Sequence, residues 1–505
     1  MKKLQMTINT ANRIGHINRE LYGMFAEQLG TGVYGGIYVG QGSDIPNVNG
    51  IRTDVVEALK RIRTPLIRWP GGCFTEYYHW KDGIGPKEER RPFVNKWWGE
   101  EVDDASFGTH EFFDLCEQVG CEPYLVANNA TSTPREIDEW IEYITYDGDS
   151  AMGRLRRKNG REQPWRLKYF CIGNEFFTCG GEMTPEFYAS EYKRRMRFSW
   201  DYSGNKLYRI VRGMHANQFA ITDAVVDQLE RRHFDAYTIY LIISPQDPDK
   251  PVNPNEAHPD MTGSATDFTR QAYYSTINSA LRIDRAIDRH IGIIHKRSEL
   301  DDVRLIVDEW GTWYHPDPGR NPAHLYMQNT MRDAMVAANV LNVFNRHCND
   351  LELCCLCMMV NSLDSIIHTD GEKMILTPTY HIFDLYKEHQ DNELVDSFME
   401  NSYIEGEDCR VPALSQSVST DQEGRLYITL SNCSLEEDFS IDCTLLYREY
   451  AKCTGRILTG EVHAHNSFED PCAVSIAPFD DMVLEDQTLT VHMPPCSVVS
   501  LILET

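Results

Sequence analysis

VRLIVDEW, at residues 303–310, is a nearly continuous apolar run that ends in two carboxylic acids and a tryptophan. Runs of this kind are typical of parallel strands that are buried on both faces. Comparable runs, separated by amphipathic stretches with helical spacing, occur at residues 21–25, 65–69, 122–127, 167–173, 207–213, 234–242 and 351–360. Eight strand–helix units predict an α/β fold, a (β/α)8 TIM barrel.

The pattern changes after residue 390, where short alternating strands are separated by Gly, Asn and Asp turns. RLYITL (425–430), TLTVHM (488–493) and SVVSLILE (497–504) are examples, and they indicate an antiparallel sheet. The opening stretch KLQMTIN (3–9) alternates in the same way. We therefore predict an N-terminal strand (1–18) that joins the β-sandwich, a catalytic barrel (19–390) and a C-terminal antiparallel β-sandwich (391–505).

The net charge and the hydropathy of the sequence disfavour some classes of partner. The 505 residues include 49 Lys and Arg against 76 Asp and Glu, a formal net charge of −27. Nucleic acids and anionic membranes are bound through positive patches, so neither is expected as a partner. The N-terminus lacks the apolar stretch of a secretory signal, and no apolar run reaches the length of a membrane span. These patterns favour a cytoplasmic protein.

The fifteen cysteines do not suggest a metal centre. Cys354, Cys355 and Cys357 lie inside an apolar run and are expected to be small buried hydrophobic residues. Cys354 and Cys357 form a CxxC pair, but no second pair of ligands lies at metal-binding spacing. We expect no metal and no cofactor.

Acidic residues follow two of the predicted strands. The active site of a (β/α)8 barrel lies at the C-terminal ends of its strands. The fourth strand ends in Asn174 and Glu175, the seventh in Glu309, and the second in Arg68 and a Gly-Gly turn. Two glutamates facing each other across a barrel are the pair that glycoside hydrolysis requires. Strand alternation directs Asp308 away from Glu309, which predicts a structural role for Asp308.

Several long motifs, in the same order, resemble glycoside hydrolase family 51, the α-L-arabinofuranosidases. The resemblance covers nearly the whole chain and rests on YGMFAEQLG (22–30), LIRWPGGCF (66–74), HWKDGIGPKEERR (79–91), FGTHEFFDLCEQVGCEPY (107–124), IGNE (172–175), VDEWGTWY (307–314), NTMRDAMVAANVLN (329–342) and ILTPTYHIFDLYKEHQ (375–390). It implies a barrel joined to a sandwich, a retaining mechanism, no cofactor, and a homo-oligomer that is often a hexamer.

The resemblance also implies roles for individual residues. Glu175 corresponds to the general acid/base and Glu309 to the nucleophile, whose carboxyl groups should be ~5–5.5 Å apart for a retaining reaction. Asn174 is similar to the asparagine that binds the sugar 2-hydroxyl. The glycone subsite is implied to include Glu27, Cys73 and Trp98.

The chain departs from the family pattern at three positions of this subsite. On the sixth strand Tyr240 replaces a His and Ile242 replaces a Tyr, and on the eighth strand Met358 replaces a Gln. Loss of the hydroxyl at position 242 removes a hydrogen bond expected to reach Glu309, worth ~1.5–3 kcal/mol because the acceptor is charged. We expect Tyr240 and Met358 to line the pocket and to alter its choice of sugar.

These observations predict a retaining exo-glycosidase that releases terminal α-L-arabinofuranosyl, or closely related furanosyl, residues from oligosaccharides. Two alternatives stay open. One is a retaining glycosidase of altered glycone specificity, either a galactofuranosidase or an endoglucanase-like enzyme. The other is a carbohydrate-binding pseudoenzyme of the same fold, in which the strand-end carboxylates no longer catalyse turnover.

Overall fold

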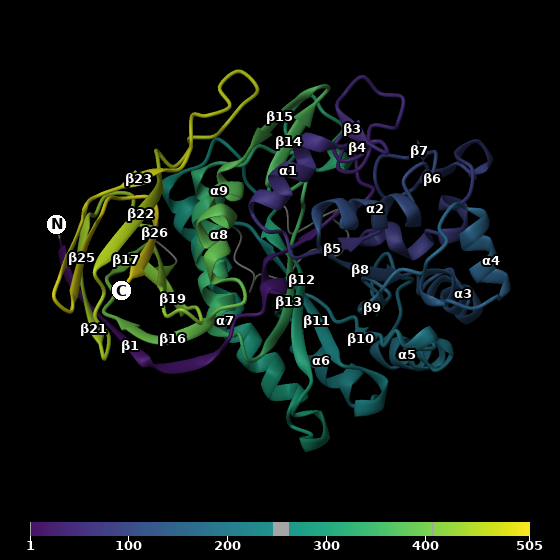
Figure 1. Cartoon of the computed structure of the whole chain (residues 1–505), viewed down its shortest axis with the longest axis horizontal. Coiled ribbons are helices and arrows are strands. Elements are labelled where there is room, and N and C mark those ends of the chain that lie inside the picture. Colours follow the sequence, from purple (N-terminus) through teal and green to yellow (C-terminus); the bar gives the residue numbers. More distant parts are fainter. Residues whose placement is uncertain (1, 246–261, 407–408) are drawn as a thin grey trace.

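A closed barrel of eight parallel strands forms the centre of the computed structural model, which describes residues 2–245, 262–406 and 409–505 (Figure 1). Every strand predicted from an apolar run is present: β2 (Gly23–Phe25), β5 (Leu66–Trp69), β8 (Glu122–Ala127), β9 (Tyr169–Ile172), β10 (Tyr208–Val211), β11 (Ala236–Ile243), β12 (Arg304–Thr312) and β13 (Leu351–Leu356). Their side chains are almost all buried, as expected for strands covered on both faces.

Helices surround the barrel: α1 (Thr53–Arg61), α2 (Thr109–Val119), α3 (Pro134–Thr145), α4 (Ala151–Lys158), α5 (Pro185–Phe198), α6 (Phe219–Val226), α7 (Arg270–Ile294), α8 (Met331–Arg346) and α9 (Pro378–Tyr386). Local chemistry sets where they begin. The Thr133 hydroxyl accepts the Glu136 N–H, and Pro134 takes the first helical position of α3. Within the described residues, no helix is apolar over the length that a membrane span needs.

The N-terminal strand β1 (Lys2–His16) lies inside the C-terminal sheet rather than in the barrel. It pairs antiparallel with β16 (Glu393–Met399) and parallel with β21 (Phe439–Leu446). The remaining strands pair antiparallel: β19 (Leu414–Thr420), β20 (Leu426–Asn432), β22 (Lys452–Thr459), β23 (Ala477–Phe479), β24 (Met482–Glu485), β25 (Thr488–Met493) and β26 (Ser497–Glu504).

Helices α8 and α9 join the two parts, because both pack on strands of the C-terminal sheet and lie beside the barrel in Figure 1. The predicted fold class, a (β/α)8 barrel with a C-terminal β-sandwich, is confirmed. The domain boundaries after residues 18 and 390 stay a prediction, and the only parallel pair of the C-terminal sheet, within the described residues, is β1 with β21.

Candidate active site

Glu309, on β12, is held by two buried arginines. Arg68 Nη1 donates to Glu309 Oε1 at 2.7 Å and Arg212 Nη2 donates to the same oxygen at 2.9 Å. Arg68 lies on β5 and Arg212 directly follows β10, so both approach from the C-terminal ends of strands. Two charge-assisted hydrogen bonds therefore hold the Glu309 carboxyl group at the mouth of the barrel.

Asp308 binds the same arginines, which corrects the expectation that it is directed away from Glu309. Arg212 Nη1 donates to Asp308 Oδ1 at 2.5 Å, and Arg68 Nε lies 3.7 Å from Asp308 Oδ2. The alternation is interrupted because β12 carries one residue more than β11 at this point: Ile239 pairs with Val307, and Tyr240 with Glu309. Asp308 is fully buried, consistent with a structural role.

Asn174 and Glu175 follow β9 (Tyr169–Ile172) and lie beside the arginine cluster. Arg68 Nη2 donates to Asn174 Oδ1 at 2.7 Å, so one guanidinium contacts both Asn174 and Glu309. The Thr178 hydroxyl donates to Glu175 Oε2 at 2.8 Å. Arg212 also lies within electrostatic range of both Glu175 and Glu309. The ~5–5.5 Å separation of the two catalytic carboxyl groups stays a prediction.

A buried carboxylate shapes the loop that carries Asn174. Glu76 accepts the backbone N–H groups of Asn129 (2.9 Å), Ala130 (3.0 Å) and Asn174. It therefore fixes the loops after β8 and β9 against the loop after β5. An unpaired buried carboxylate is costly, so these three donors stabilise both the charge and the loop geometry.

Glu27, after β2, shapes the turn that follows β5. Its Oε1 accepts the N–H groups of Gly72 (2.9 Å) and Phe74 (3.1 Å) and the indole N–H of Trp98 (2.9 Å). Burial raises the pKa of Glu27 from its ordinary value of 4.5 to about 7, and the nearby charge of Glu309 acts in the same direction, against the lowering effect of the donors. Glu27 and Trp98 thus lie together, as the resemblance implied.

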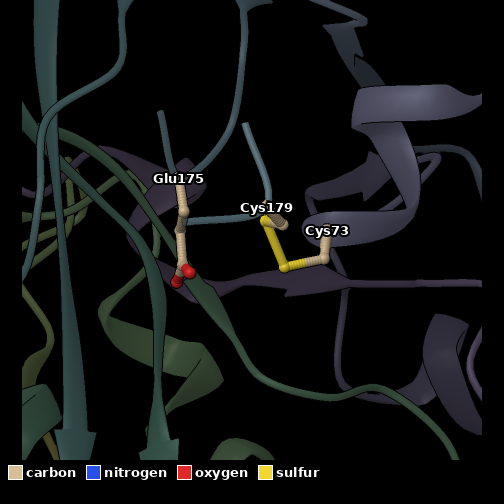
Figure 2. A group of neighbouring side chains, drawn as sticks. All are labelled: Cys73, Glu175 and Cys179. Carbon is tan, nitrogen blue, oxygen red and sulfur yellow. A yellow bond between two sulfur atoms is a disulfide. The ribbon is translucent and has the colours of Figure 1, made fainter. Parts of the chain in front are cut away.

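A disulfide joins Cys73 to Cys179 beside Glu175 (Figure 2). Cys73 follows the Gly-Gly turn after β5, and Cys179 lies on the Glu175 loop, 106 residues away in sequence. This pairing was not predicted. The other thirteen cysteines form no disulfide, and Cys354, Cys355 and Cys357 are buried as predicted.

Comparisons with known proteins identify the architecture. Two family models match, the α-L-arabinofuranosidase 1 domain at residues 58–218 and the α-L-arabinofuranosidase C-terminal domain at residues 308–497. The intracellular exo-α-L-arabinofuranosidase of Bacteroides ovatus is 40% identical over 505 residues, which cover 100% of this chain and 96% of the relative. The chain belongs to the family 51 α-L-arabinofuranosidases. It is therefore a glycoside hydrolase.

Solved structures of the family agree. The family 51 arabinofuranosidase of Xanthomonas axonopodis pv. citri superposes with a TM-score of 0.95 at 35% identity, covering 100% of both chains. The α-L-arabinofuranosidase of Thermotoga maritima, solved as an arabinose complex, gives a TM-score of 0.86 at 27% identity and covers 99% of this chain and 100% of its own.

The substituted strands of this family 51 enzyme lie next to the charged cluster. Tyr240 pairs with Glu309 across β11 and β12, and its ring lies 5.3 Å from the Arg212 guanidinium and 5.4 Å from the His215 ring. Met358 is buried and lines a small cavity together with Glu27. Tyr240 thus lies beside the charged cluster, and Met358 lies beside Glu27 of the implied glycone subsite.

Three residues of the site, namely Arg212, Glu76 and Cys179, were not predicted from the sequence. Arg212 could have been predicted as a site residue, because it lies at the end of the fifth apolar run as Arg68 lies at the end of the second. The other two had no local signal. The partners of Glu76 are backbone groups on distant loops, and the partner of Cys179 is 106 residues away.

We predict that Glu27→Gln weakens the pH dependence of stability. The folded-state pKa of about 7 exceeds the ordinary 4.5, so the folded protein holds more protons between these values and loses stability as pH rises through them. The free energy of unfolding falls by ~3 kcal/mol at most over this pH range. Glutamine cannot ionise, so Glu27→Gln should lack this contribution.

Thermal unfolding at pH 5 and pH 8 measures the effect. Between pH 5 and pH 8 we expect the Tm of the wild type to fall more than the Tm of Glu27→Gln. The control is Glu57→Gln, a matched change at an exposed side chain, whose Tm should fall as much as that of the wild type. Equal falls in the wild type and in Glu27→Gln would show that the Glu27 carboxyl keeps an ordinary pKa.

Proposed function

We propose that this enzyme releases terminal α-L-arabinofuranosyl residues from short oligosaccharides by double displacement. The observation that carries the proposal is the paired donation of Arg68 and Arg212 to Glu309, with Asn174 and Glu175 beside them. A carboxyl group held in place next to a second carboxyl group is the arrangement that a retaining glycosidase requires. The exo-acting name of the Bacteroides ovatus relative supports the same conclusion.

In the first step Glu309 attacks the anomeric carbon while Glu175 donates its proton to the departing glycosidic oxygen. The bond to the leaving group breaks as the ester to Glu309 forms. In the second step Glu175 takes a proton from water, the water oxygen bonds to the anomeric carbon, and the Glu309 carboxylate is released. Asn174, held by Arg68, is positioned to donate to the sugar 2-hydroxyl.

Arabinofuranose recognition is assigned to one group of residues, Glu27, Cys73 and Trp98, and to a second group, Tyr240 and Met358. The second group replaces polar family residues with an aromatic and an apolar side chain, and this observation favours altered glycone specificity as the second candidate. A site that lacks hydrogen-bonding groups binds a different set of hydroxyls. A galactofuranoside, or an endo-acting role, is therefore the main alternative substrate class.

We infer a cytoplasmic enzyme that needs no cofactor and forms a homo-oligomer, a hexamer if it follows the resemblance. The intracellular name of the Bacteroides ovatus relative supports the compartment. The net charge of −27 disfavours nucleic acid and anionic membranes as partners.

The first test compares hydrolysis of the 4-nitrophenyl α-L-arabinofuranoside, β-D-galactofuranoside, β-D-xyloside and β-D-glucoside. We expect the arabinofuranoside to give the highest kcat/KM, and Glu309→Ala to abolish turnover because no nucleophile remains. Glu57→Ala, a change at an exposed side chain, serves as the control and should retain wild-type activity. Preference for another glycoside would mean that the glycone pocket has an altered specificity. Turnover that Glu309→Ala leaves unchanged would refute the assignment of the active site.

A second test addresses Glu175. Glu175→Ala should lower kcat by ~10²–10⁴ on an alkyl arabinofuranoside, whose leaving oxygen needs a proton. On the 2,4-dinitrophenyl arabinofuranoside the glycosylation step should be nearly unchanged, because that leaving group departs without protonation. Pre-steady-state release of dinitrophenol measures this step. Equal losses on both substrates would mean that Glu175 is not the acid.

A further inference from the structure

Three possible ligand atoms for a soft metal ion meet at one edge of the active site. The sulfur atoms of Cys73 and Cys179 and a carboxylate oxygen of Glu175 all lie within 4.8 Å of one another. They come from two loops, one after β5 and one after β9 (Figure 2). While the disulfide is intact, its sulfur atoms cannot act as thiolate ligands.

We propose that reduction of Cys73–Cys179 creates a binding site for one soft divalent cation of the Zn²⁺ class, and that the bound cation inhibits the enzyme. The inhibition, but not the binding, rests on the proposed role of Glu175 as the acid. Thiolate and carboxylate ligands are those that Zn²⁺ and Cd²⁺ accept. A water molecule completes four-coordination.

The chemistry balances with a dithiol as the reductant. The dithiol supplies two electrons and two protons, the Cys73–Cys179 bond breaks to two thiols, and the reductant leaves as its own disulfide. The cation then displaces the two thiol protons and the carboxyl proton of Glu175, and it forms two metal–sulfur bonds and one bond to Glu175 oxygen. A cytoplasmic enzyme would meet such reductants continually.

The backbone geometry suits this ligand set. The Cα atoms of Cys73 and Cys179 are 5.4 Å apart. Bonds of ~2.3 Å in a tetrahedral site place two zinc-bound sulfurs ~3.8 Å apart, which rotation of the freed side chains can supply. The Asn174 amide nitrogen lies 4.0 Å from the Cys179 sulfur and can steady a thiolate there.

Charge and access favour a cation at this edge. Cys73 and Glu175 are half-buried, so both a reductant and an ion can reach them, whereas Cys179 is 8% exposed. Arg212, which interacts electrostatically with Glu175, directs both terminal nitrogens to Asp308 and Glu309. The net charge of −27 raises the cation concentration around the protein.

The binding test uses the whole enzyme, reduced and then freed of reductant under argon, and titrated with Cd²⁺. The ultraviolet charge-transfer band of cadmium thiolate reports binding without any catalytic turnover. We expect one additional equivalent of band intensity in the reduced wild type relative to the oxidised wild type. Cys179→Ser should lose this equivalent, and Glu175→Gln should bind it at least tenfold more weakly.

The matched control is Cys121→Ser. Cys121 neighbours another thiol, Cys116, but lies between α2 and β8, at the opposite ends of the barrel strands. It should keep the additional equivalent. A reduced wild type that binds no more Cd²⁺ than the oxidised form, or a Cys179→Ser protein that binds as much as the reduced wild type, would overturn the site.

The inhibition test adds one equivalent of Zn²⁺ during hydrolysis of an alkyl arabinofuranoside. The reduced wild type should lose at least tenfold in kcat, whereas the oxidised wild type and Cys179→Ser should each keep their own zinc-free rates. A cadmium band accompanied by an unchanged rate would confirm the metal site and contradict the role of Glu175. The two proposals can therefore fail separately.

Discussion

The carboxylate of Glu309 and the two guanidinium groups that bind it form the interaction on which the site depends. Arg68, Arg212, Asp308 and Glu309 bring two positive and two negative charges together in the barrel. Charges that are removed from water must be paired, because the loss of one member leaves the others buried without a partner. The cluster therefore fixes the ends of β5, β10 and β12 relative to one another and places Asn174 through Arg68. The same pairing that satisfies the buried charges fixes the position of the Glu309 carboxyl group.

Around this cluster, buried carboxylates organise loops rather than react. Glu27 holds the turn after β5 through Gly72 and Phe74, and Glu76 holds the loops after β8 and β9. The Cys73–Cys179 bond then ties the β5 loop to the loop of Glu175. Three separate constraints thus hold the proposed acid in place. Among these constraints, the disulfide is the one that a reductant can remove.

Much of this architecture could be predicted because parallel barrel strands are marked by local sequence. Each of the eight apolar runs became a strand, and strand ends located Glu175 and Glu309 at the mouth. Helix α8 begins at Met331 because Thr330 and Asp333 form a capping box there. The extra residue at Asp308 was not predictable, because a bulge depends on the neighbouring strand. Contacts between distant loops, such as Cys73 with Cys179, leave no local pattern.

The central assignment is Glu309 as the nucleophile, and covalent trapping tests this assignment most directly. A 2-deoxy-2-fluoro arabinofuranoside with a good leaving group forms the glycosyl ester but slows its hydrolysis, since fluorine destabilises the oxocarbenium-like transition state. After peptic digestion, peptide mass spectrometry locates the label. We expect one adduct per chain, on the carboxylate of Glu309. A label on Glu175, on another residue, or no label during continued turnover of ordinary substrate would contradict it.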